Sequence, residues 1–152
     1  MSDNRHQFSN AGDALAFVLA GDATFTAVSM KSGARYTFQV SKPDNFNPQR
    51  PLWFVRVLTG PNNTADYTYI GKIGNDLRFA LTAKSKMTSD SAPVKAFDWV
   101  LSGLLRNVIV GVEIWHEGKC GRCGLPLTVP ESIASGIGPT CASKMQTGRM
   151  AA

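Results

Sequence analysis

The pattern of apolar and polar residues changes from a helical period to a strand period near residue 22. Residues 13–20 have apolar side chains at helical spacing, with Asp13 placed to cap a helix and Gly21 to end it. Between residues 23 and 81, apolar and polar positions alternate in short runs divided by turn residues. The runs are 24–30, 35–40, 52–58, 67–73 and 77–81. This pattern predicts an antiparallel five-stranded meander.

The C-terminal side of the meander returns to helical spacing. Apolar residues recur over 93–106, after Ser91 as a cap and Pro93 in the first turn. The predicted apolar stripe of this helix is Val94, Phe97, Leu101, Leu104 and Leu105. Residues 108–115 have a β-type composition and should return beside the sheet. We therefore predict an α+β fold, with a five-stranded antiparallel meander and one packed helix, followed by a small treble-clef-like zinc module. The expected boundaries are 1–111 for the sheet domain, 112–146 for the zinc module and 147–152 for a disordered tail.

Composition excludes several classes of protein. Hydrophobic residues make up 43% of the 152 residues, enough for a core, so the chain is not wholly disordered. No apolar run approaches the roughly 18 residues of a membrane helix. The polar N-terminus argues against a secretory signal, and three cysteines, an odd number, argue against a disulfide framework. We expect a cytoplasmic protein without a membrane partner.

Positive charge is concentrated in the middle of the chain. The whole sequence has 16 basic and 11 acidic residues, a formal charge of +5. Residues 31–86 alone have nine bases and three acids, a charge of +6, whereas residues 1–30 carry −2. A surplus confined to one segment favours a binding face for a polyanion. The alternative is a solvated sheet face that keeps the protein soluble.

The cysteine segment predicts a metal site. Cys120 and Cys123 are separated by two residues in a glycine-rich turn, a spacing that directs both sulfurs to one side, as in a zinc knuckle. Cys141 follows a Gly-Pro-Thr turn at the expected start of a helix, where the helix dipole favours a thiolate. A knuckle followed by a cysteine at a helix start is typical of a treble-clef-like zinc finger.

Three cysteines leave a tetrahedral zinc site one ligand short. His116 is the best candidate for the fourth ligand because it lies shortly before Cys120. The other candidates are a histidine near the chain terminus and three carboxylates, which are harder ligands: His6, Glu113, Glu117 and Glu131. Two interpretations without zinc also remain. The cysteines could be buried structural thiols, or a redox pair that leaves the third cysteine unexplained.

The same segment resembles a short cysteine-containing family of unknown function. The family pattern runs C-G-R-C-G-x-x-L-T, then P-x-S-I, then G-I-G-P-x-C, and residues 120–141 carry each part of it. The likeness covers about residues 116–145, and residues 54–71 are similar to the region that often precedes this module. The resemblance implies a metal-binding module and an origin in a phage or another mobile element, and therefore a place in the host cytosol. It implies no activity.

No catalytic constellation is recognisable in the sequence. The chain lacks a G-x-S-x-G motif, a phosphate-binding glycine loop and a dinucleotide fingerprint. A zinc ion closed by three cysteines and one histidine has no open position for catalysis. We therefore expect a non-enzymatic protein.

Two kinds of partner remain, of which we favour nucleic acid. Bases alternate with aromatic residues along the predicted sheet, so phosphate contacts could combine with base stacking. The aromatic candidates are Tyr36, Phe38, Trp53, Tyr67 and Tyr69, although each is also a candidate for the core. The predicted nucleic-acid-binding residues are Arg35, Arg56, Lys72, Arg78, Lys119 and Arg122. The alternative partner is a host protein complex, such as a defence complex that this protein would modulate or inhibit. The sequence does not indicate an oligomeric state.

Overall fold

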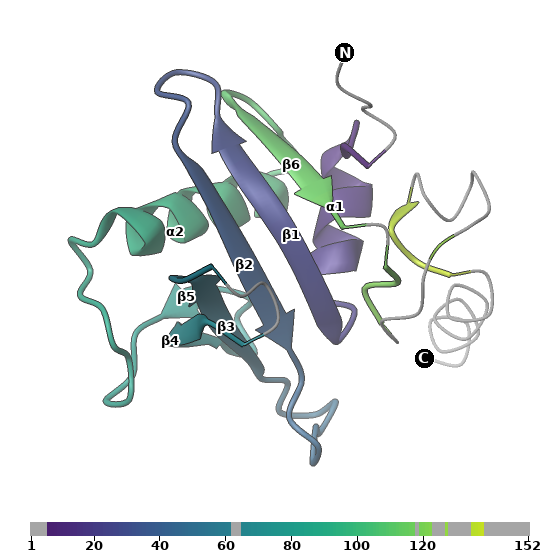
Figure 1. The fold of residues 1–152 in the computed structure, drawn as a ribbon. Coiled ribbons are helices and arrows are strands. Elements are labelled where there is room, and N and C mark those ends of the chain that lie inside the picture. The colour runs from purple at the N-terminus through teal and green to yellow at the C-terminus, as the bar shows by residue number, and fades with distance from the viewer. Residues whose placement is uncertain (1–5, 62–64, 118, 123–126, 128–134, 139–152) are drawn as a thin grey trace.

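The described part of the chain forms two helices and six strands (Figure 1). The computed structural model describes residues 6–61, 65–117, 119–122, 127 and 135–138. The helices are α1 (Ala11–Val18) and α2 (Ala92–Leu105). The strands are β1 (Asp22–Ser29), β2 (Arg35–Ser41), β3 (Trp53–Leu58), β4 (Tyr67–Ile73), β5 (Phe79–Ala80) and β6 (Val112–His116).

All six strands form one antiparallel sheet in the order β5-β4-β3-β2-β1-β6. The five predicted strands are neighbours in chain order, so the meander and the α+β class are confirmed. The expectation that residues 108–115 return beside the sheet is also confirmed, because β6 pairs with β1, and this makes the sheet six-stranded and not five-stranded. The sheet thus continues past residue 111, where we had placed the end of the first domain.

Both helices pack on one side of the sheet, which we call the covered face. In Figure 1 they lie behind β1, β2 and β6. The core between these layers is centred on Phe97 of α2, whose ring lies 5.1 Å from that of Phe38 and 6.4 Å from that of Phe25. Four of the five residues of the predicted stripe are buried, whereas Leu105 in the last turn is exposed. Two packed helices therefore replace the one expected.

Helix α1 begins two residues before the predicted start. Its cap is Asn10, whose side-chain oxygen accepts a hydrogen bond from the Asp13 N–H at 2.8 Å. Asp13 therefore belongs to the first turn and does not cap the helix. An asparagine is as good a cap as an aspartate, so the local sequence did not separate the two.

The sheet is strongly twisted. In Figure 1 β1 and β2 cross the view, whereas β3, β4 and β5 are seen almost end-on. The pairing of β3 with β4 shifts register between Val55 and Arg56, and such a bulge increases the local twist. Among the described residues, no helix is both long and apolar enough to cross a membrane.

Candidate functional site

The Cys120 thiol is buried and surrounded by backbone donors. The residue is 1% exposed. Its sulfur accepts hydrogen bonds from the Arg122 N–H at 3.4 Å and from the Gly138 N–H at 3.2 Å. Amide donors of this kind favour the charged form of a sulfur ligand. The environment of Cys120 therefore suits a thiolate that binds a metal ion.

His116 ends β6 with its side chain on the covered face. The residue is 4% exposed, and its ring is packed among three other rings. It stacks on His6 with the ring centroids 4.8 Å apart, and it contacts Phe8 at 5.4 Å and Phe17 at 5.7 Å. The His116 N–H also donates to the His6 C=O at 2.9 Å. These contacts fix the position of the His116 ring at the end of β6.

Glycines bring the cysteine segment close to α1. A Cβ atom at Gly121 or at Gly136 would lie 2.5 Å from the Cδ2 atom of Phe17. The Gly121 N–H donates to the Gly136 C=O at 2.8 Å, and the Gly121 C=O accepts from the Asp22 N–H at 2.7 Å. Cys120, through its neighbour Gly121, and His116 therefore both lie close to the Phe17 ring.

Two of the four predicted zinc ligands, Cys120 and His116, can be placed in the structure. Cys123 and Cys141 lie outside the described residues. Within the described part of the chain, no three histidine, cysteine or carboxylate side chains form a cluster. The chemistry of Cys120 fits zinc, and the complete ligand set stays a prediction.

The alternative fourth ligands occupy different positions. Glu113 alternates with His116 along β6, so it points to the opposite face, where it accepts a hydrogen bond from the Trp115 Nε1 at 3.2 Å. Glu117 is exposed, and Glu131 lies outside the described residues. His6 is the alternative that contacts His116 directly.

The side of the sheet opposite the helices, which we call the open face, carries the second candidate site. Strand register brings its side chains into rows across the sheet. One row is Thr24, Gln39, Arg56 and Tyr69, and the next is Asp22, Ser41, Phe54, Lys72 and Ala80. A third row contains Glu113, Val28 and Arg35. Three predicted nucleic-acid-binding residues, Arg35, Arg56 and Lys72, therefore share this face.

Arg56 lies in the middle of the open face. Its Nη1 atom donates to the Ser41 Oγ at 3.2 Å, and its guanidinium lies 6.0 Å from the ring centre of Phe54. Phe54 and Tyr69 meet edge to face at 6.1 Å. The central cation is thus bordered by two aromatic rings that are only partly buried.

The other three predicted bases lie away from this centre. Arg78 lines a hollow beside α2 together with Asp98 and Arg106. Arg122 lies near Lys42, the residue that follows β2. Burial lowers the pKa of the Lys42 ammonium, and the positive charge of Arg122 lowers it further. Lys119 and Arg122 are both exposed. The predicted bases therefore do not form one continuous patch.

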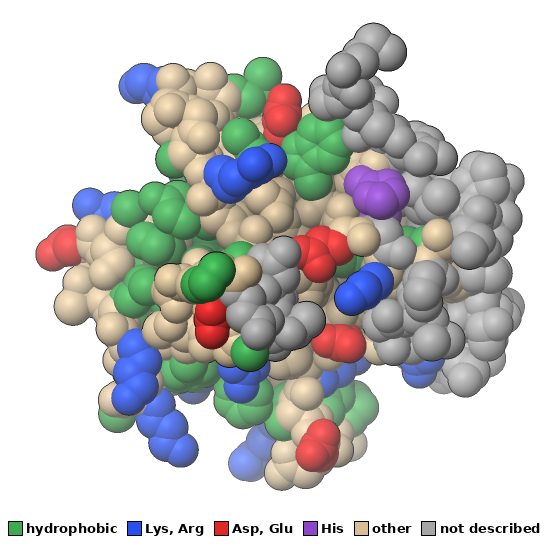
Figure 2. Space-filling model, in the orientation of Figure 1, with side chains coloured by type: hydrophobic (Ala, Val, Ile, Leu, Met, Phe, Trp, Pro, Cys, Tyr) green, Lys and Arg blue, Asp and Glu red, His purple; other side chains and the backbone are tan. Residues whose placement is uncertain are grey.

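Acidic residues share the open face with the bases. Asp22 and Glu113 occupy rows that also hold Lys72 and Arg35. The Tyr67 side chain is on this face as well, and its buried Oη atom has no hydrogen-bond partner among the residues that the structure describes. Burial, and then the charge of Glu117, raise the pKa of Tyr67. Figure 2, which views this side of the sheet, shows basic and acidic side chains mixed.

Three of the five aromatic candidates lie on the covered face. Alternation along 35–40 predicts this for Tyr36 and Phe38, and the structure confirms it. Trp53 is also in the core, and its Nε1 donates to the Leu19 C=O at 3.1 Å. Phe54 and Trp115 lie on the open face and were missed. The signal was present for Phe54, because it alternates in phase with Arg56 along β3.

Comparison with known proteins gives one match. Residues 115–146 match a family of unknown function (DUF6011). Neither the curated proteins nor the solved structures contain a match to this chain. The match covers β6 from Trp115 onward together with the cysteine segment, and the rest of the sheet and both helices lie outside it.

Proposed function

We propose that this is a non-enzymatic, zinc-containing protein that binds single-stranded nucleic acid across the open face of its sheet. The observation that carries the proposal is the placement of Arg56 at the centre of that face, paired with Tyr69 across the strands and beside the Phe54 ring, which contacts Tyr69 edge to face. A guanidinium contacts a phosphate, and a partly exposed aromatic ring stacks on a base. Cations and aromatic rings that alternate along neighbouring β-strands suit a chain of nucleotides, in which each phosphate is followed by a base.

Single-stranded nucleic acid fits this surface better than a duplex. Stacking on Phe54 or Tyr69 requires bases that are not already stacked in a helix. The face contains no dense cluster of bases, since Arg35, Arg56 and Lys72 are offset by Asp22 and Glu113. We therefore expect modest affinity and weak sequence preference.

We propose zinc as the cofactor, with Cys120, Cys123, Cys141 and His116 as its ligands. When bound, the ion supplies a structural crosslink between the end of β6 and the segment that follows. The support from the described residues is the Cys120 sulfur with its two amide donors. The resemblance of this segment to a family common in phages leads us to propose an accessory protein of a mobile element.

Fluorescence anisotropy with a labelled 20-nucleotide oligothymidine tests the nucleic-acid proposal. Three phosphate contacts predict a slope of about −2 for log K against log salt, because counterions are released. The substitution Arg56→Glu should weaken binding at least tenfold at low salt. Arg78→Glu is the matched control, since it makes the same charge change away from the open face.

Three outcomes would contradict the proposal. One is an absence of binding to the oligonucleotide at about 25 mM salt, where electrostatic attraction is strongest. Another is an equal loss of affinity in Arg56→Glu and Arg78→Glu, which would indicate attraction by net charge alone. A preference for duplex over single strand would remove the stacking argument.

A further inference from the structure

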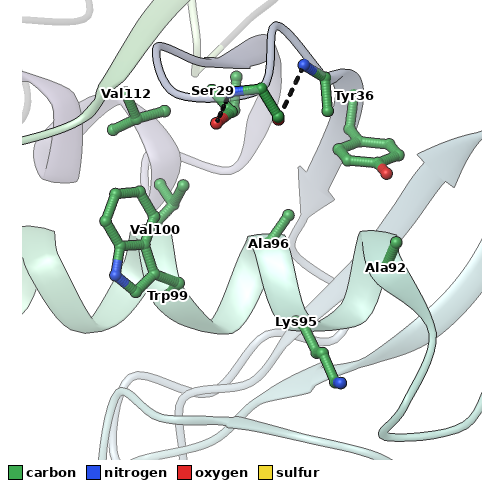
Figure 3. Close-up of a pocket in the computed structure, with 11 residues that line it drawn as sticks. Ser29, Tyr36, Ala92, Lys95, Ala96, Trp99, Val100 and Val112 are labelled. Atoms are coloured by element: carbon green, nitrogen blue, oxygen red, sulfur yellow. Dashed lines mark hydrogen bonds between the residues drawn. The ribbon is translucent and has the colours of Figure 1, made fainter.

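The covered face is packed unevenly. Beside α2, a groove of about 520 Å³ remains between Trp99 and the β1–β2 hairpin (Figure 3). Beside α1, by contrast, the His116 side chain is surrounded by rings. They belong to His6, Phe8 and Phe17. Two of these rings come from residues 6–8, which we call the N-terminal segment, so this segment lies against a predicted zinc ligand.

The N-terminal segment pairs with the outer edge of β6. The His116 N–H donates to the His6 C=O at 2.9 Å, and Gln7 forms an antiparallel bridge with Trp115. Residues directly opposite each other in an antiparallel pair have their side chains on the same face. His6 therefore lies opposite His116 on the covered face, whereas Gln7 lies with Trp115 on the open face.

Phe8 anchors the N-terminal segment in the core. The residue is 3% exposed, and its N–H donates to the Ile114 C=O at 2.9 Å. Its ring packs on Phe17 of α1 with the centroids 5.2 Å apart, and on His116 at 5.4 Å. The buried ring holds the segment on β6, and it thereby places the His6 imidazole two residues away along the same face.

The His6 and His116 rings are stacked. Their centroids are 4.8 Å apart, and their planes are inclined by only 18°. An imidazole binds a metal ion in its own ring plane, along the lone pair of a nitrogen at about 2.0 Å. Two nearly parallel planes at this separation do not meet at so short a distance, so the two rings cannot ligate one zinc ion together. A stacked ring covers a face of its neighbour and not the edge that carries the nitrogens.

We propose that His6 is a positioning residue for the zinc site and not one of its ligands. This role rests on the zinc site proposed above, with His116 as its nitrogen ligand. The His6 imidazole, held on β6 by the backbone bond to His116 and by Phe8, stacks on the His116 ring. It thereby fixes the plane in which a nitrogen of His116 meets the ion. Groups that orient a metal ligand in this way typically change metal affinity by about 10–100-fold.

Zinc affinity, measured by competition with a chromophoric chelator, tests this role. His6→Ala should weaken zinc binding about tenfold. His6→Phe should bind zinc as the parent protein does, because a phenyl ring also stacks and has no nitrogen for a metal. Gln7→Ala is the matched control in the same segment and should also bind normally, since the Gln7 side chain lies on the open face. With cobalt(II) in place of zinc, the visible spectrum of His6→Phe should match that of the parent protein, because the ligand set is unchanged.

A double-mutant cycle separates an effect on His116 from a general loss of packing. The substitution His116→Phe keeps a ring under His6 and removes the ligand nitrogen. In this background, His6→Ala should cause no further loss of zinc affinity, because the nitrogen that His6 positions is gone. A purely structural role of the N-terminal segment would give the same loss in both backgrounds.

Three results would overturn the positioning role while the zinc site stands. One is a zinc affinity of His6→Ala equal to that of the parent protein. Another is a loss in His6→Phe as large as in His6→Ala, which would make the His6 nitrogen a ligand. The third is the same loss from His6→Ala in the parent and His116→Phe backgrounds. Parent protein that binds no zinc would instead overturn the proposed zinc site, and this role with it.

Discussion

The ring of Phe17 in α1 lies directly against the backbone of Gly121, with no space for a side chain between them. A Cβ at Gly121 would be 2.5 Å from the Phe17 Cδ2 and 3.1 Å from its carbonyl oxygen. Gly121 is next to Cys120, whose sulfur accepts hydrogen bonds from two backbone N–H groups. The Phe17 ring also contacts His116. The first helix therefore fixes the position of two predicted zinc ligands.

This contact predicts a strong effect of Gly121→Ala. The added methyl group must displace Phe17, and overpacking of a core typically costs about 1–3 kcal/mol. We expect a loss of stability of that size in urea denaturation, together with weaker zinc retention. Gly138→Ala is the matched control near the same sulfur, because its Cβ would lie at an ordinary 3.8 Å from the Cys120 Sγ. Equal tolerance of both substitutions would contradict the packing argument.

Elemental analysis of reduced, purified protein should find about one zinc ion per chain. Cys120→Ser should abolish zinc binding, since it removes a thiolate with two amide donors. His116→Ala should reduce affinity if the imidazole is the fourth ligand. Glu113→Gln should retain full zinc content, because Glu113 lies on the opposite face of β6. Protein that contains no metal would refute the zinc proposal.

The core predicts a contrast between two neighbouring aromatic residues of α2. Phe97 is buried among three phenylalanine rings, whereas Trp99 is half exposed. Phe97→Ala should therefore cost about 3–5 kcal/mol in the free energy of unfolding. Trp99→Ala should cost clearly less. Chemical denaturation of both variants checks this, and a similar loss in the two would show that the covered face is assigned wrongly.

Alkaline pH should destabilise the fold through Tyr67. Burial, and then Glu117, raise the pKa of this phenol above its ordinary value of 10.0. Above about pH 10 the unfolded chain therefore releases a proton that the folded chain keeps, so stability falls as pH rises. Tyr67→Phe should make this decline shallower and should not destabilise the protein at neutral pH, because the buried Oη has no hydrogen-bond partner to lose among the described residues. Urea denaturation at a series of pH values measures both effects.

Tyr69→Phe is the control for this pair of measurements. The Tyr69 hydroxyl lies 3.2 Å from the Thr82 Oγ1, so its removal breaks a hydrogen bond that Tyr67 does not make. We expect a small loss of stability at neutral pH, about 0.5–1.5 kcal/mol. A steeper alkaline decline in Tyr67→Phe than in the parent protein would contradict the direction of the pKa shift.

Local sequence determined the elements of this protein. Alternation with a period of two identified β1 to β5, and the spacing of Val94, Phe97, Leu101 and Leu104 identified α2, because each pattern reflects which side of one element is buried. The same alternation placed the Arg35 side chain on the opposite face of the sheet from Tyr36 and Phe38. The Cys120–Cys123 spacing predicts a metal site from the same kind of local pattern, and this site stays a prediction.

Tertiary structure decided how those elements combine. The pairing of β6 with β1 depends on contacts between segments more than 80 residues apart, which no local pattern encodes. The bulge between Val55 and Arg56 sets the register that brings Arg56 beside Tyr69, whereas Arg78, with similar local chemistry, turns toward α2. The charge of a segment could therefore be counted from the sequence. Its distribution over the faces could not, because it depends on strand register and on which face the helices cover.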